Sequence, residues 1–207
     1  MSGGRKKDFD SEVALQSAMH VFWEKGYIGA SLSNLTERMG INKPSLYNTF
    51  GNKEALFIQA TKLYCDNKIN SLSALLADKT IPLKQRLKNY MMSVLSVQCE
   101  SEPAKGCYVV QCQSEVASGE IPNEASQLLM HAGEAVKDLL ISTLSDDQES
   151  KALGLDKEAK QKALCLSATL RGTATLARSG YSKDELEYVI DHSLKGIGLD
   201  ENAKDSV

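Results

Sequence analysis

Residues 40–57 have the sequence GINKPSLYNTFGNKEALF, which contains two asparagine–lysine pairs. Asparagine is a preferred N-cap residue, because its side chain accepts a hydrogen bond from a free N–H group of the first helical turn. Asn42 and Asn52 therefore each predict a helix start, and Gly51 predicts the end of the first of these helices. Pro44 fits this interpretation, because a proline in the first turn loses no intrahelical hydrogen bond.

Another helix is predicted just before this stretch, with Ser31 as its N-cap and Gly40 at its end. Its inward positions are Leu32, Leu35, Thr36 and Met39. Two helices joined by a few residues form helix-turn-helix geometry, in which the later helix enters the DNA major groove. The outward positions of that later helix, all able to bond or stack, are Lys43, Ser45, Tyr47, Asn48 and Thr49. The spacing alone also suits a structural helical hairpin with a solvated polar face.

The remainder of the chain predicts an all-α protein, because apolar residues recur at helical spacing and no segment alternates as a β-strand does. A helix before Ser31 is expected to stop at Gly26. Further helices are expected over residues 53–77, 83–95, 107–118, 124–144 and 157–177, and a last one begins at the capping box of Ser182 and Glu185. Residues 145–155 predict a polar loop, and residues 201–207 a frayed tail.

Composition indicates a globular protein, with 42% apolar and 25% charged residues among 207. The net charge of −3 is unevenly distributed: residues 1–53 hold seven Lys and Arg against five Asp and Glu, so a polyanion would be tolerated there. Three of these cations, Arg5, Lys6 and Lys7, resemble a basic arm before the first helix. With no run of about 18 apolar residues and no signal peptide, we expect a cytoplasmic protein.

The five cysteines and three histidines do not form a metal-type array, so we expect reduced thiols, no metal and no cofactor. Cys107 follows Lys105 and Gly106 at a predicted helix start, where the helix dipole and a nearby ammonium favour a reactive thiolate. Cys99 and Cys112 are candidate resolving thiols for it. A purely structural Cys107 is the alternative, and both interpretations stay open.

The stretch EKGYIGASLSNLTERMGINKPSLYNTFGNKEALF, residues 24–57, resembles the DNA-binding domain of the TetR/AcrR (tetracycline-repressor-type) family of bacterial transcriptional regulators. The turn pattern of that family matches at Gly40, Ile41, Leu46, Tyr47, Phe50, Asn52, Lys53, Glu54 and Leu56. The resemblance implies a helix-turn-helix domain over residues 1–52 and a helical regulatory and dimerisation domain over residues 53–207. It also implies a homodimer, which pairs through its last two helices and acts on a palindromic DNA operator in the bacterial cytoplasm, associated with the nucleoid.

Positions matched to the family imply roles for individual side chains. Ser33 would contact a phosphate, Lys43, Ser45 and Asn48 would face bases, and Tyr47 and Lys53 would hold the DNA backbone. Thr49 departs from the family, in which many members have His or Tyr at this position, so a smaller hydroxyl contact is expected there.

An effector pocket among the middle helices is also implied by the resemblance, and its candidate lining residues are Tyr90, Cys107, Tyr108, Gln111, His131 and Arg171. Arg171 would meet an anionic ligand or form an ion pair between subunits. The resulting hypothesis is a repressor released by a small molecule, with activation in place of repression left open and with an electrophile or redox sensor acting through Cys107 as the alternative. A helical enzyme using Cys107 and His131, and a protein that coats DNA without sequence preference, are remoter alternatives.

Overall fold

The computed structural model of the chain describes residues 9–68, 73–102 and 104–200, and the regular structure of these residues is entirely helical. The predicted all-α class is therefore confirmed. The α-helices are α1 (Ser11–Gly29), α2 (Leu32–Met39), α3 (Lys43–Phe50), α4 (Lys53–Lys68), α5 (Ala74–Ala77), α6 (Leu83–Glu100), α7 (Tyr108–Gln113), α8 (Asn123–Asp146), α9 (Gln148–Ala152), α10 (Ala159–Arg178) and α11 (Lys183–Gly196). Two 3₁₀ turns, η1 (Val116–Ser118) and η2 (Asp156–Glu158), complete them. None of the described helices has the length and apolarity needed to cross a membrane.

The helix starts predicted around α3 and α4 are confirmed. The side-chain oxygen of Asn42 accepts a hydrogen bond from the backbone N–H of Ser45 at 2.8 Å, and that of Asn52 accepts one from Ala55 at the same distance. Ser31 caps α2 in the same way, and Gly40 ends that helix in the left-handed conformation at φ 67°. Local sequence chemistry thus accounts for each boundary of the helix-turn-helix.

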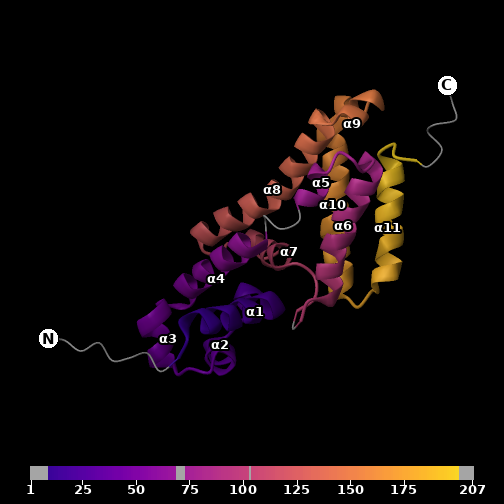
Figure 1. Cartoon of the computed structure of the whole chain (residues 1–207). Helices are drawn as coiled ribbons and strands as arrows, with labels where there is room; N and C mark the ends of the chain where they lie inside the picture. The colour runs from indigo at the N-terminus through magenta and orange to yellow at the C-terminus, as the bar shows by residue number, and fades with distance from the viewer. Residues whose placement is uncertain (1–8, 69–72, 103, 201–207) are drawn as a thin grey trace.

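The three amino-terminal helices form a unit that α4 connects to the rest of the molecule (Figure 1). The Phe22 and Phe57 rings meet edge to face at 4.9 Å, which joins α1 to α4. The same hydrophobic core continues into the body of the molecule, because it includes Tyr108 of α7 and Leu129 of α8. Where the two domains divide, placed at residue 52 from the sequence, stays a prediction.

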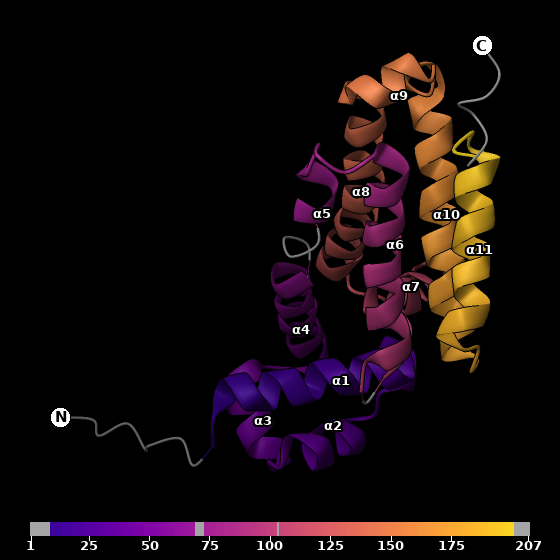
Figure 2. The ribbon, with the colours of Figure 1, turned by 45° about the vertical axis from the view of Figure 1, so that its right-hand side comes forward.

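Four long helices, α6, α8, α10 and α11, form the body of the molecule (Figure 2). Their apolar faces enclose a second core, which contains Leu83, Leu87, Tyr90, Met91, Leu95, Leu186, Ile190 and Leu194. The capping box at the start of α11 is present as predicted, since Ser182 and Glu185 bond to each other's backbone N–H groups.

Three predicted segments were wrong in their extent. The predicted helix over residues 53–77 is instead α4, which reaches Lys68, and a separate α5 that begins at Ala74. The predicted helix over residues 107–118 is only the short α7 followed by η1. Residues 145–155, predicted to be a loop, contain α9, whose N-cap Asp147 accepts hydrogen bonds from the backbone N–H groups of Glu149 and Ser150. The basic arm and the tail (residues 201–207) lie outside the described residues.

Candidate functional site

The outer face of α2 and α3 carries most of the side chains that the sequence assigned to DNA. Ser33, Lys43, Tyr47 and Asn48 are exposed, and their side chains make no hydrogen bond to any other residue that the structure describes. Ser45 and Thr49 are half-buried. Leu46 and Phe50 on the opposite side of α3 are buried in the core. The polar groups of α3 are therefore free to meet a partner outside the chain.

Lys53 lies at the start of α4 and is held by an aromatic ring. Its Nζ atom lies 4.5 Å from the ring centroid of Tyr27, in cation–π contact. Burial lowers the pKa of Lys53, while the carboxylates of Glu115 and Glu120 act in the opposite direction. Lys53 is also the first residue of α4, and the free N–H groups of a helix amino terminus are a favourable environment for a phosphate. Sequence reasoning missed Tyr27, because no local pattern places it under Lys53.

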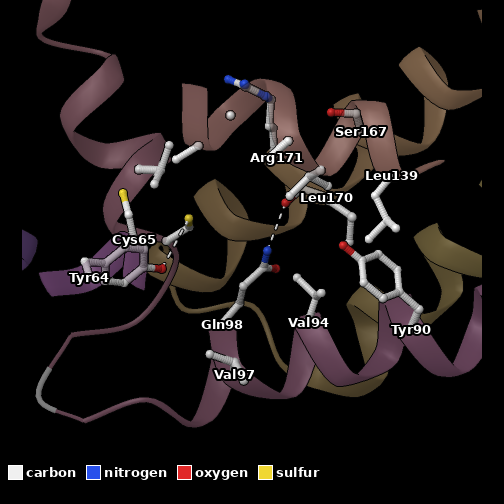
Figure 3. Close-up of a pocket in the computed structure, with 16 residues that line it drawn as sticks. Tyr64, Cys65, Tyr90, Val94, Val97, Gln98, Leu139, Ser167, Leu170 and Arg171 are labelled. Carbon is white, nitrogen blue, oxygen red and sulfur yellow. Dashed lines mark hydrogen bonds between the residues drawn. The ribbon is translucent and has the colours of Figure 1, made fainter. Parts of the chain in front are cut away.

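A cavity of about 230 Å³ lies inside the body, between α4, α6, α7, α8 and α10. Apolar side chains make up most of its wall, namely Val94, Val97, Val109, Ala132, Ala135, Val136, Leu139 and Leu170. Its polar lining consists of Tyr64, Cys65, Tyr90, Gln98, Cys107, Ser167 and Arg171. Figure 3 shows Tyr64 and Cys65 facing Gln98 and Tyr90 across this space.

Tyr90, Cys107 and Arg171 were predicted to line a pocket, and the structure places all three in this wall. Tyr108, Gln111 and His131 lie outside the lining. Tyr108 is fully buried, and its hydroxyl lies 2.8 Å from that of Thr61. His131 is exposed, because it projects from the outer face of α8. A sequence pattern marks them as helical positions, but only packing distinguishes the cavity wall from the core and the surface.

Arg171 does not point its charge into the cavity. Its Nη1 atom donates a hydrogen bond to Oε1 of Gln113 at 2.7 Å. The guanidinium passes Gly133, where a Cβ atom would lie only 2.5 Å from Nη2. In Figure 3 the guanidinium is turned away from Tyr90 and Gln98. The aliphatic stem of Arg171 is therefore the part that lines the wall, and neither predicted role of its charge is tested.

Two thiols line the cavity, Cys107 and Cys65. Cys107 directly precedes α7 in the chain, and its sulfur lies 3.7 Å from the Tyr64 hydroxyl. Burial raises the pKa of Cys65 to about 11, and it also raises the pKa of Cys99 and of Cys112. For the candidate resolving thiols Cys99 and Cys112, this shift disfavours the reactive thiolate. No group of three or more metal-binding side chains occurs among the described residues.

Comparison with known proteins agrees with the interpretation of α2 and α3 as a DNA-binding helix-turn-helix. A sequence profile of the bacterial regulatory proteins of the tetR family matches residues 14–60. The HTH-type transcriptional regulator YezE of Bacillus subtilis is 28% identical, covering 92% of this chain and 97% of its own length. The HTH-type transcriptional repressor ComR of Escherichia coli is 28% identical, covering 94% of this chain and 91% of its own.

A solved structure shares the whole architecture. The TetR family transcriptional regulator CifR, in a cysteine mutant complexed with 26-base-pair double-strand operator DNA, is 26% identical and superposes with a TM-score of 0.78. The alignment covers 92% of this chain and 98% of CifR. The match thus extends from the helix-turn-helix through the helical body, and the chain belongs to the TetR family of bacterial transcriptional regulators.

Proposed function

We propose that the chain is a homodimeric transcriptional repressor that binds a palindromic DNA operator and releases it when a small molecule occupies the cavity. The observation that carries the proposal is the outer face of α3, beside the cation of Lys53. Its polar side chains Lys43, Tyr47 and Asn48 are exposed and make no hydrogen bond to another described residue. Like all TetR regulators the chain is a non-enzymatic protein, which removes the thiol-dependent enzyme from the alternatives.

On this proposal the contacts divide into two kinds. Lys53, Tyr47 and Ser33 would hold phosphates and set the position of the protein, which adds affinity for any sequence. Lys43, Ser45 and Asn48 would face base edges from the recognition helix. Thr49 would make a smaller hydroxyl contact to the DNA backbone. The operator-bound CifR and the repressor ComR support both DNA binding and repression.

A second copy would pair through α10 and α11. Leu164 of α10 is 58% exposed and Tyr188 of α11 is 66% exposed, so large apolar groups of both helices face outward. Two copies related by a twofold axis would present their α3 helices to half-sites about 34–36 Å apart. Substitution of both residues by glutamate should yield a monomer in sedimentation velocity, and a dimer of unchanged stability would contradict this arrangement.

The effector would be a small and largely apolar molecule, because most of the cavity wall is aliphatic. A ligand changes DNA affinity only if it binds one conformation of the protein better than the other. The protein would act on chromosomal DNA in the bacterial cytoplasm.

Selection of bound fragments from a random DNA pool tests the proposal. We expect enrichment of a palindrome whose half-sites are about one helical turn apart. Binding with a steep salt dependence but no preferred palindrome would instead indicate a protein that coats DNA, and it would overturn the operator proposal.

A second candidate mechanism is release by modification of Cys107, with the cavity acting as the entry site. It is favoured by the position of this sulfur in the cavity wall, 3.7 Å from the Tyr64 hydroxyl. An oxidant or electrophile that reached the cavity would meet it there, whereas Cys112 is fully buried.

A further inference from the structure

Two charged side chains, Arg178 and Glu115, form hydrogen bonds with the backbone of α1 on either side of a bend at Gly26. This glycine, where the sequence predicts a helix end, has φ 72° and ψ 179° within α1, so the helix bends there and continues to Gly29. Arg178, the last residue of α10, donates hydrogen bonds from its guanidinium to the carbonyls of Trp23, at 3.0 Å, and Glu24. These carbonyls belong to the last helical turn before the bend.

Glu115, between α7 and η1, holds the other side of the bend. Its Oε2 atom accepts a hydrogen bond from the backbone N–H of Ile28 at 3.0 Å. A Cβ atom at position 26 would lie 1.7 Å from Oε1 of Glu115, so the carboxylate occupies the space that glycine leaves open. The Arg178 cation thus binds carbonyls before the bend, and the Glu115 anion binds an N–H group after it. A positive charge is favourable at the end of a helix and a negative charge at its start, so both contacts stabilise the bend. We call Arg178, Glu115 and Gly26 the clamp.

The clamp is connected to the cavity by two elements. α10 contributes Ser167, Leu170 and Arg171 to the cavity wall and ends at Arg178, about two turns beyond Arg171. Cys107 and Val109, at the start of α7, lie in the same wall, and Glu115 follows the end of that helix.

The two elements also contact each other. Gly106, with φ 84°, brings the chain before α7 so close to α10 that a Cβ there would lie 2.7 Å from the carbonyl oxygen of Ala174. If α10 or the chain at the start of α7 moved at the cavity wall, the movement would therefore be transmitted to the clamp through backbone that is in direct contact.

We propose that Glu115 and Arg178 are positioning residues for DNA binding, which hold the bend of α1 and so set the direction in which each subunit presents α3. Neither residue lines the cavity or lies on the outer face of α2 and α3, although the Glu115 carboxylate also acts on the charge of Lys53. In a dimer, the angle of each DNA-binding unit determines the distance between the two α3 helices, so the clamp selects the spacing of half-sites and not their bases. This inference rests on the proposed operator binding.

The test is selection of bound DNA by the full-length protein and by Glu115→Ala and Arg178→Ala. We expect the wild type to enrich one half-site spacing, and both variants to enrich the same half-site bases at several spacings. Affinity for the wild-type palindrome should fall about tenfold, the value of one hydrogen bond to a charged group. The control is Glu124→Ala, which removes an exposed 2.6 Å ion pair between α8 and Lys62 of α4 without contacting the bend.

Conservative variants separate positioning from general damage. Glu115→Gln keeps an acceptor for the Ile28 N–H, so it should restore the single spacing, and hydrogen exchange of the Ile28 amide should rise in Glu115→Ala but not in Glu115→Gln. The fluorescence of Trp23, the single tryptophan of the chain, should shift in Arg178→Ala, because its carbonyl loses a partner and its ring lies 5.4 Å from that of Tyr64.

The outcomes are distinguishable. A wild type that enriches no palindrome overturns the proposed function and this inference together. Variants that keep the single spacing and bind within about twofold of the wild type overturn the inference alone. Loss of base preference within each half-site also overturns it, since that result would mean damage to α2 and α3 themselves.

Discussion

The guanidinium Nη2 of Arg86 lies 2.7 Å from Oδ2 of Asp147, and both side chains are at most 5% exposed. Two further donors of Arg86, Nε and Nη1, bond the carbonyls of Ile81 and Leu76, each at 2.9 Å. Asp147 in turn caps α9, and Glu149 of α9 accepts a hydrogen bond from the Leu83 N–H at the start of α6, at 2.7 Å. This network joins α5, α6 and α9 at the end of the body far from the DNA-binding unit (Figure 2).

Removing one partner of this buried pair should destabilise the fold strongly. Asp147→Ala leaves the Arg86 charge buried without its counterion, and we expect it to lower the free energy of unfolding by about 3–5 kcal/mol. Urea unfolding at fixed protein concentration measures this loss. The exposed ion pair of Lys62 and Glu124 provides the control, since Glu124→Ala should cost at most about 1 kcal/mol. If both substitutions lowered the free energy of unfolding equally, the buried Arg86–Asp147 pair would not have the stabilising role given to it here.

The same carboxylate should make stability depend on acid pH. Burial alone would raise the pKa of Asp147, but its hydrogen bonds with Arg86 and with the N–H groups of Ser150 and Glu149 outweigh burial and lower it. Because the pKa of Asp147 is lower in the folded protein, its carboxylate contributes its full stabilisation above the ordinary Asp pKa of about 3.9. This contribution is lost as the pH falls through the pKa that Asp147 has in the folded state. The stability difference between wild type and Asp147→Asn should therefore shrink between about pH 5 and pH 3. A difference independent of pH in urea titrations would be inconsistent with this.

Gly26→Ala should be more destabilising than Gly119→Ala, although both glycines have positive φ. It adds the strain of a side chain at φ 72° to a steric overlap with the Glu115 carboxylate, so we expect a loss of about 2–4 kcal/mol. Gly119→Ala is the matched control, because Gly119 has φ 76° but a Cβ placed there would meet no atom within 4 Å, and it should cost about 1 kcal/mol. In a double-mutant cycle, Glu115→Ala should remove most of the excess.

Lys53→Ala and Asn48→Ala should weaken DNA binding in different ways. Loss of the Lys53 phosphate contact in both subunits should lower affinity for all sequences and reduce the slope of log K against log salt by about 2. Asn48→Ala should cost about 1–3 kcal/mol on the preferred site and relax base choice there, with the salt slope unchanged. Fluorescence anisotropy over a salt series measures both effects, with Lys62→Ala as a lysine control on α4. Identical slopes for Lys53→Ala and wild type would exclude the phosphate contact.

Oxidant response distinguishes the two release mechanisms. If Cys107 is the sensor, hypochlorite should release the wild type from DNA but leave Cys107→Ser bound, because the sulfur that would be oxidised is absent. Cys165→Ser, which removes an exposed cysteine outside the cavity, should respond as the wild type does. A Cys107→Ser protein that hypochlorite releases as readily as the wild type would exclude Cys107 as the sensor.

The recognition unit was predictable from local sequence, whereas the cavity was not. Caps at Ser31, Asn42 and Asn52 act within three residues of their own positions, so short-range patterns locate α2, α3 and α4. The polar run of residues 145–155 predicts a loop because the partner that buries it, Arg86, lies 61 residues away from Asp147 in the chain. Of the residues predicted to line the cavity, Tyr90 lies in its wall, whereas Tyr108 lies in the core and His131 at the surface. What packs against each of these helical positions is not encoded by the local sequence.

The helix-turn-helix, the all-α class and the polar side chains offered to DNA follow from the sequence alone, because capping, helical periodicity and turn glycines act between neighbours in the chain. The place of the cavity, the thiols that line it and the packing of Lys53 on Tyr27 depend on the tertiary structure. It also decided that Arg178 and Glu115, which belong to different helical segments, meet at one bend of α1. These contacts depend on how helices pack against one another, and no local pattern encodes the pairing of side chains so far apart in the chain.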